Sequence, residues 1–182
     1  TAVGVVMGIH ALYEIFVSGV PIDFASLLKY LPVSALYILS MAIGYIGLRY
    51  IELSISSPIC NSSGALAFLL CLIFGIFSTE DITVTTIVGI VMITVGIIAL
   101  GFVEQREDEE VRKARQERAN RKYAKSILAF LLPISYLIID ALGTVGDEFI
   151  FSDRSPVEIS DYAANSAFEL TFFVLAIFAF IW

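Results

Sequence analysis

The chain has 182 residues, of which 58% are hydrophobic and 16% are charged, and its mean hydropathy is +0.88. A soluble globular chain is about half apolar and about a quarter charged, so this composition excludes an ordinary soluble enzyme. The net charge of −7, from 18 acidic and 11 basic residues, leaves a nucleic-acid partner without electrostatic support. One histidine and two cysteines, with no CxxC motif, exclude a multi-histidine metal site and a redox pair. We therefore expect no enzymatic activity, no metal and no cofactor.

The uncharged stretches of the chain are long enough to cross a membrane. Between Glu52 and Glu80 lie 27 uncharged residues, and between Asp81 and Glu104 lie another 22. A bilayer core of about 30 Å is crossed by about 20 apolar helical residues. The expected fold class is therefore all-α, a polytopic transmembrane helix bundle. In chain order, the expected helices cover residues 2–20, 31–52, 59–78, 83–103, 126–146 and 162–182.

The segment 104–125 differs from the rest of the chain in composition. It holds eight of the eleven Lys and Arg residues together with six carboxylates. Its acids lie towards the start and its bases towards the end, as a helix dipole favours. This pattern predicts a solvated helical linker, with a docking surface for a partner as the alternative. The positive-inside rule predicts that the linker lies in the cytoplasm.

Three stretches of the chain resemble a known family. They are residues 45–59 (YIGLRYIELSISSPI), 79–83 (TEDIT) and 89–97 (GIVMITVGI). Their order and spacing resemble the EamA-type transporters of the drug/metabolite transporter superfamily. In the last stretch, Gly89 and Gly96 lie seven residues apart on one helix face, where they let another helix approach closely.

The resemblance implies ten helices in two five-helix repeats of inverted topology. The six expected helices then look like the second to the seventh, with residues 1–103 in the first membrane repeat and 126–182 in the second. We interpret the chain as a fragment, because it starts at Thr1 rather than at a methionine and stops at Trp182 inside an apolar run. The usual family orientation would place the linker outside the cell, against the positive-inside prediction.

The first and sixth expected helices carry matching polar residues. His10-Ala-Leu-Tyr-Glu14 aligns with Asn165-Ser-Ala-Phe-Glu169 when the two halves are treated as repeats. The i, i+4 spacing places His10 beside Glu14, and Asn165 beside Glu169. When each repeat has an odd number of helices, corresponding helices of the two repeats run antiparallel. The polar faces of these two helices can therefore meet at a cavity near the middle of the membrane. The functional interpretation is that the two polar pairs line a transport path and that one or both glutamates bind protons. The alternative is a structural hydrogen-bonded pair that holds helices together.

Two further polar features lie in the apolar regions. Asp140 lies well inside the fifth expected helix and is a candidate cation or proton site, although Gly143 and Gly146 after it also fit the end of that helix. Serines and asparagine surround Pro58 over residues 54–64. This cluster predicts a polar turn with a helix cap. The alternative is a small-residue wall of the substrate cavity, which the resemblance implies for the fourth helix.

The resemblance and the paired glutamates predict a secondary-active transporter that moves a small organic metabolite or drug-like solute by alternating access, driven by a proton or other ion gradient or by the substrate's own gradient. The expected partners are the small-molecule substrate, membrane lipid, and protons or another coupling ion, and a homodimer is a further expectation. The acidic candidates favour cationic or zwitterionic substrates. The rival interpretation is a non-transporting membrane scaffold or sensor that keeps the transporter fold. We expect an integral protein of the plasma (inner) membrane.

Overall fold

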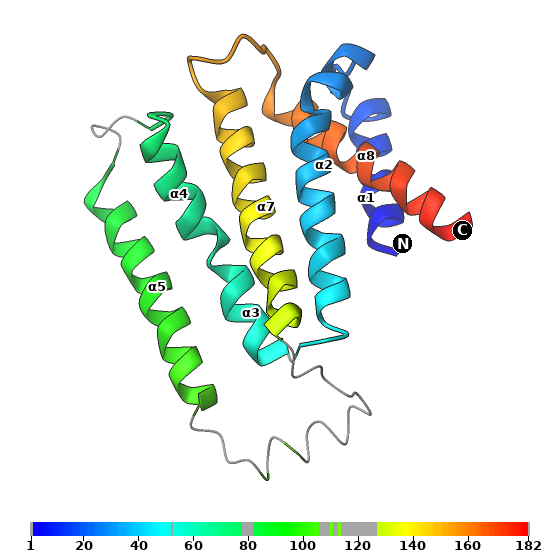
Figure 1. The fold of residues 1–182 in the computed structure, drawn as a ribbon. Coiled ribbons are helices and arrows are strands. Elements are labelled where there is room, and N and C mark those ends of the chain that lie inside the picture. Colours follow the sequence, from blue (N-terminus) through cyan, green and yellow to red (C-terminus); the bar gives the residue numbers. More distant parts are fainter. Residues whose placement is uncertain are drawn as a thin grey trace. The chain divides into compact units, whose positions relative to one another are not determined.

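The computed structural model of the chain describes residues 2–51, 53–77, 82–105, 110, 113 and 127–181. These residues form helices and no strand, so the predicted all-α fold class is confirmed. Figure 1 shows the helices in chain order: α1 (Ala2–Phe16), α2 (Phe24–Gly47), α3 (Leu53–Asn61), α4 (Ser63–Ile73), α5 (Val84–Gln105), α7 (Ile127–Phe151) and α8 (Asp161–Ile181).

Four segments of the described chain are long and apolar enough to cross a membrane. They are Phe24–Gly47, Ser56–Ile73, Phe130–Phe151 and Asp161–Ile181. Two shorter apolar helices, Ala2–Phe16 and Val84–Gly96, accompany them. Each of the six expected spans therefore coincides with an apolar helical segment, although several boundaries differ from the prediction.

Helix α1 ends at Phe16, four residues before the predicted end at residue 20. The chain turns at Gly19, whose φ of +73° lies in the left-handed region that glycine adopts without strain. The backbone N–H of Val20 donates to the carbonyl of Glu14 at 3.1 Å, which satisfies one of the free carbonyls at the helix end. The apolar residues after Phe16 therefore belong to a turn.

Helix α2 begins at Phe24, seven residues before the predicted start at residue 31. Asp23 caps it, because its Oδ1 accepts hydrogen bonds from the backbone N–H of Ser26 at 2.7 Å and from the Ser26 hydroxyl at 2.6 Å. Pro32, which falls in the first turn of the predicted span, lies inside the observed helix. The Asp23 cap therefore determines where α2 begins. At its other end, α2 stops at Gly47 rather than at the predicted residue 52.

The predicted span 59–78 is interrupted, because α3 ends at Asn61 and α4 begins at Ser63. At the break, the N–H of Ser62 donates to the carbonyl of Ile59 at 3.1 Å, the tighter i to i−3 spacing. The Ser62 hydroxyl donates to the carbonyl of Pro58 at 2.8 Å. The span is therefore two helices joined at one serine.

Helix α4 ends at Ile73, five residues before the predicted end, through a glycine cap. Gly75 has a φ of +65°, and its N–H donates to the carbonyl of Leu72 at 3.1 Å. The N–H of Ile76 donates to the carbonyl of Cys71 at 2.8 Å. These two bonds satisfy carbonyls of the last turn, which is how glycine ends many helices.

Helix α7 continues to Phe151, five residues beyond the predicted end at residue 146. Gly146 lies against α2, since a Cβ atom there would stand 3.2 Å from Cγ2 of Val33. This glycine therefore provides space between two helices rather than ending one. Helices α5 and α8 agree with the predicted spans to within two residues. The predicted linker 104–125 lies outside the described residues, except for 104 and 105 at the end of α5 and the single positions 110 and 113.

By its internal contacts, the chain divides into two compact units. The first unit is Thr1–Ile38 with Gly146–Trp182, and the second is Leu39–Val145. The core of the first unit contains Tyr30, Val33, Ala164 and Ala167. The core of the second contains Ala67, Cys71, Ala141 and Val145. Each unit combines residues of both predicted repeats, so the inverted-repeat architecture stays a prediction.

Candidate functional site

Within the first unit, helices α1 and α8 pack against each other, and glycines on α1 allow the close approach (Figure 1). A Cβ atom on Gly4 would lie 2.8 Å from the Phe172 ring, and one on Gly8 would lie 2.7 Å from Cβ of Phe173. Real Cβ atoms essentially never approach other atoms below 3.0 Å. Glycine is therefore required at both positions for the helices to cross at this separation.

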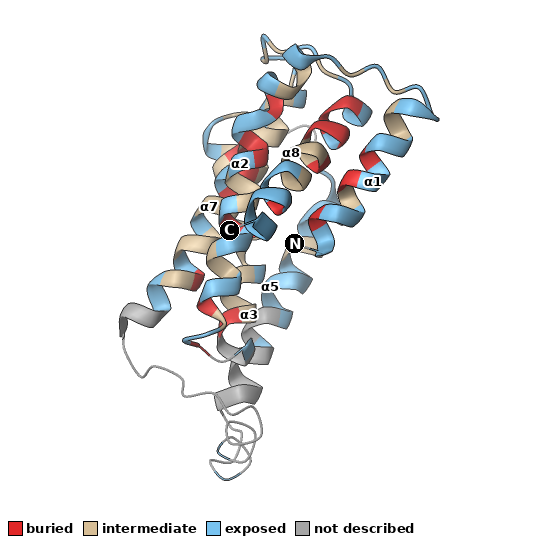
Figure 2. Ribbon diagram, turned by 90° about the vertical axis from the view of Figure 1, so that its right-hand side faces the viewer, coloured by how far each residue is buried: buried red, intermediate tan, exposed pale blue. Residues whose placement is uncertain are grey.

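The two helices run antiparallel. Gly4 meets Phe172 and Ala176, whereas His10, further along α1, meets Glu169, which is earlier in α8. Rising residue numbers in α1 therefore match falling numbers in α8, as predicted for this pair of helices. Buried positions of both helices are marked in Figure 2.

The crossing brings His10 against Glu169. Nδ1 of His10 lies 2.9 Å from Oε2 and 3.1 Å from Oε1 of Glu169. The Glu169 side chain is only 11% exposed, whereas that of His10 is 54% exposed. The contact is an ion pair with a protonated imidazole, and a hydrogen bond with a neutral imidazole that carries its proton on Nδ1. Either form gives the buried carboxylate a polar partner, which offsets its loss of water.

The other members of the two predicted pairs lie beside this contact. Glu14 is half-buried one turn along α1 and acts on His10 through its charge. Asn165 is exposed, one turn before Glu169 on α8. The structure therefore joins one member of each predicted pair, His10 and Glu169, in a contact between helices.

In the second unit, Asp140 of α7 accepts hydrogen bonds from serines on two other helices. The hydroxyl of Ser40 in α2 donates to Oδ1 at 3.0 Å, and the hydroxyl of Ser63 in α4 donates to Oδ2 at 2.7 Å. Both serines are buried. Asp140 lies inside α7 rather than at its end, and its carboxylate connects three helices.

The serine-rich stretch before Ser62 is helical, so the polar turn predicted for it is wrong except at Ser62 itself. On α3, the Asn61 amide donates to the Ser57 hydroxyl at 3.2 Å, and Ser56 pairs with the Cys60 thiol at 3.7 Å. Both pairs join residues one turn apart. Both pairs therefore stay within α3, and of their side chains that of Ser56 is buried and that of Asn61 is exposed.

The close helix approach predicted at Gly89 and Gly96 does not occur within the described chain. Nothing lies within 4 Å of a Cβ atom built on either glycine, and α5 is exposed from Val91 to Gly96 (Figure 2). The approach occurs instead at Gly4 and Gly8. Their four-residue spacing, typical of close helix packing in membranes, is the sequence signal that identifies them.

The sequence reasoning also missed a buried contact in the first unit. The Tyr30 hydroxyl of α2 donates to Oδ1 of Asp147 in α7 at 2.6 Å, and Tyr30 is buried. Asp147 follows the predicted end of its helix at residue 146, so the boundary error placed it outside the bundle. No sequence spacing pairs residues 117 positions apart.

The described residues contain no group of three His, Cys, Asp or Glu side chains that could hold a metal ion. The candidate site therefore consists of two carboxylate centres, one in each unit. They belong to a chain whose described residues form helices and include four segments long and apolar enough to cross a membrane. Comparison with protein-family models, with curated proteins and with solved structures found no match.

Proposed function

We propose that the chain is a secondary-active transporter of small organic solutes, of the EamA type, that works by alternating access with proton coupling. The observation that carries the proposal is the Glu169 carboxylate, which is 11% exposed in an apolar helix and lies 2.9 Å from His10. An ionised carboxylate at the centre of a membrane helix costs about 2.5–3.5 kcal/mol, and such groups generally lie on ion or substrate paths.

The His10–Glu169 pair gives a proton a way to change the contact between two helices. With Glu169 ionised, His10 holds α1 against α8. A proton that Glu169 takes up from one side of the membrane neutralises the carboxylate and removes its attraction for a protonated imidazole, and release to the other side restores it. Protonation therefore biases α1 and α8 between two arrangements, as alternating access requires. The antiparallel course of the two helices supports the inverted-repeat part of the proposal.

Location and partners belong to the same proposal. The plasma (inner) membrane, the cytoplasmic side for residues 104–125 and a homodimer are the expected setting. The basic residues of the linker support its cytoplasmic placement through the positive-inside rule.

The test is transport by the full-length protein in proteoliposomes. A pH jump drives uptake or efflux of a panel of amino acids, metabolites and cationic dyes, with wild type and Glu169→Gln measured together. The amide keeps the size of the side chain but cannot exchange a proton, so we expect Glu169→Gln to lose the flux that depends on the proton gradient. Glu158→Gln, at an exposed position before α8, is the matched control and should keep that flux.

The other results point elsewhere. Gradient-dependent flux in Glu169→Gln equal to that of wild type would leave Glu169 a packing role between α1 and α8. No flux of any panel member by folded wild-type protein would favour the scaffold or sensor interpretation.

A further inference from the structure

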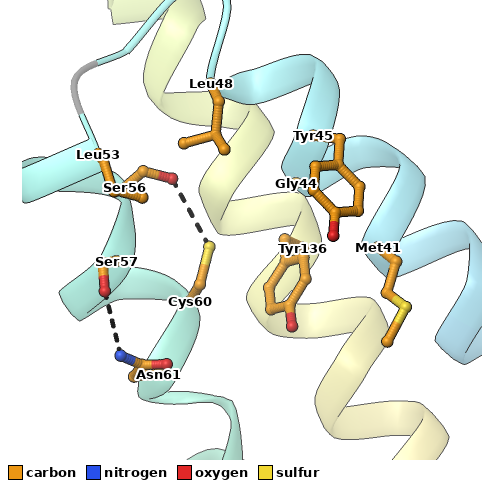
Figure 3. Close-up of a pocket in the computed structure, with 10 residues that line it drawn as sticks. All are labelled: Met41, Gly44, Tyr45, Leu48, Leu53, Ser56, Ser57, Cys60, Asn61 and Tyr136. Carbon is orange, nitrogen blue, oxygen red and sulfur yellow. Dashed lines mark hydrogen bonds between the residues drawn. The ribbon is translucent and has the colours of Figure 1, made fainter. Parts of the chain in front are cut away.

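A small cavity lies within the second unit, between α2, α3 and α7 (Figure 3). Its volume is about 270 Å³, close to the lower end for small-molecule sites. It therefore has room for a compact ligand and not for a large one. Its lining includes Met41 and Tyr45 of α2, Ser57, Cys60 and Asn61 of α3, and Tyr136 of α7.

One side of this cavity is aromatic and the other is polar. Figure 3 shows the rings of Tyr45 and Tyr136 near each other, opposite the serine, cysteine and asparagine side chains of α3. Gly44 lets the Tyr136 ring stand against α2, because a Cβ atom on Gly44 would lie 2.8 Å from Cδ2 of that ring. Tyr45 is 68% exposed, so its ring lies at the mouth of the cavity.

The described residues that line the cavity include no charged side chain, and therefore no Lys, Arg or His. Asp140 follows Tyr136 by one turn of α7, and its carboxylate interacts electrostatically with both Tyr136 and Cys60. An anion would find hydroxyl and amide donors here but no cationic side chain to balance its charge. An inorganic cation would lose part of its hydration shell on entering the cavity, and the apolar side chains of Met41 and Leu53 offer no oxygen ligands in place of that water.

We infer that this cavity binds a small organic cation with an apolar body. The faces of Tyr45 and Tyr136 attract the positive group through their ring quadrupoles, and the Asp140 charge attracts it as well. Met41 and Leu53 cover the apolar body of the ligand. The inference rests on the proposed function, since it names the class of solute, but binding is measured without flux.

The test uses Cys60 as a reporter of occupancy. In full-length protein carrying Cys71→Ala, Cys60 is the remaining cysteine of the 182-residue sequence, and Cys71 itself is only 1% exposed. The rate of Cys60 modification by methyl methanethiosulfonate is followed by mass spectrometry of the Cys60 peptide. The probe is benzyltrimethylammonium, compared with its uncharged isostere neopentylbenzene and with the anion benzenesulfonate.

We expect the cation to protect Cys60 in a saturable way. At ten times the half-protection concentration, the modification rate should fall about tenfold, because an occupied site is unreactive. The uncharged and anionic compounds should leave the rate unchanged at the same concentrations.

Variants connect the protection to the cavity. Tyr136→Leu should raise the half-protection concentration about two- to thirtyfold, the range that corresponds to one cation–π contact, and Asp140→Asn should raise it as well. Tyr136→Phe keeps the ring face and should keep the protection. Tyr162→Leu, at a position 72% exposed on α8, is the matched control. The modification rate of each variant without ligand shows whether the cavity is intact.

Three results would overturn the inference. They are no protection by the cation, equal protection by the uncharged isostere, and protection that survives both Tyr136→Leu and Asp140→Asn. Protection of Cys60 by the cation without any flux would support the binding site and contradict the proposed transport function. Proton-driven flux without protection would keep the transporter and remove this cavity as its binding site.

Discussion

Replacement of Gly8 by alanine tests how strictly the crossing of α1 and α8 positions the His10–Glu169 pair. A Cβ atom on Gly8 would stand 2.7 Å from Cβ of Phe173. The Phe173 ring can rotate away, but its Cβ is bonded to the α8 backbone, so the helices themselves must separate. Reaching an ordinary contact of 3.4 Å requires about 0.7 Å of separation. Overpacking of this kind costs about 1–3 kcal/mol.

The displacement acts on His10, two residues further along α1. If it is transmitted in full, the distance from Nδ1 to Oε2 of Glu169 grows from 2.9 Å to about 3.6 Å, beyond the hydrogen-bonding range. We expect Gly8→Ala to lower the Tm in detergent and to shift the NMR signals of the imidazole. Those signals are simple to assign, because His10 is the single histidine of the sequence.

Gly89→Ala is the matched control for this experiment. Among the described residues, nothing beyond the chain neighbours of Gly89 and the backbone of its own helix lies within 4 Å of a Cβ atom at that position, and alanine is favoured over glycine in a helix by about 0.8–1.0 kcal/mol. Its Tm should be unchanged or higher, with wild-type imidazole signals. If Gly8→Ala also kept the wild-type Tm and the wild-type signals, the close crossing of α1 and α8 would be refuted.

Three further substitutions test other parts of the fold. Asp23→Ala should lower the Tm, because α2 loses its cap. The hydroxyl and the N–H of Ser26 lower the pKa of the Asp23 carboxyl below its ordinary value of 3.8. The stabilisation by this carboxylate is therefore complete above pH 3.8 and is lost as the pH falls through the lowered pKa, which measurements of Tm against pH will show. Tyr30→Phe removes the hydrogen bond to Asp147 and should destabilise the protein by about 1.5–3 kcal/mol in denaturant unfolding. Ala167→Leu overfills a position that is 0% exposed and should cost about 1–3 kcal/mol in the same measurement.

Each of these substitutions has a control. Asp23→Asn keeps a capping oxygen and should keep most of the stability, so equal losses for alanine and asparagine would contradict the role as a cap. Tyr162→Phe and Ala179→Leu change exposed positions of α8 and should leave the unfolding free energy near that of wild type. Losses as large at these positions as at Tyr30 and Ala167 would contradict the burial described above.

The existence of the helices was predictable, and several of their ends were not. Long uncharged runs specify apolar helices, because the membrane leaves the backbone few other ways to satisfy its polar groups. The ends depend on local hydrogen bonds. Asp23 starts α2 ahead of Lys29, a residue that the apolar pattern places outside the span. Gly75 ends α4 while apolar residues continue to Phe77.

The members of the candidate site were partly predictable, and their partners were not. Glu169 and Asp140 were identified because carboxylates are rare in apolar helices. The alignment of residues 10–14 with 165–169 predicted that the two helix faces could meet, but it did not specify which side chains would touch. The contact with His10 depends on the rotation of both helices and on the close approach at Gly8. Those features arise from packing between distant segments of the chain.

The separation of His10 from Glu169 in the chain also has a consequence during synthesis. The two residues lie 159 positions apart in the chain. Because a ribosome adds about 5–20 residues per second, about 8–30 s pass between the synthesis of His10 and that of Glu169. Throughout that interval the glycine face of α1 meets lipid, water or the insertion machinery in place of α8. Slower elongation lengthens the interval during which this face lacks its α8 partner.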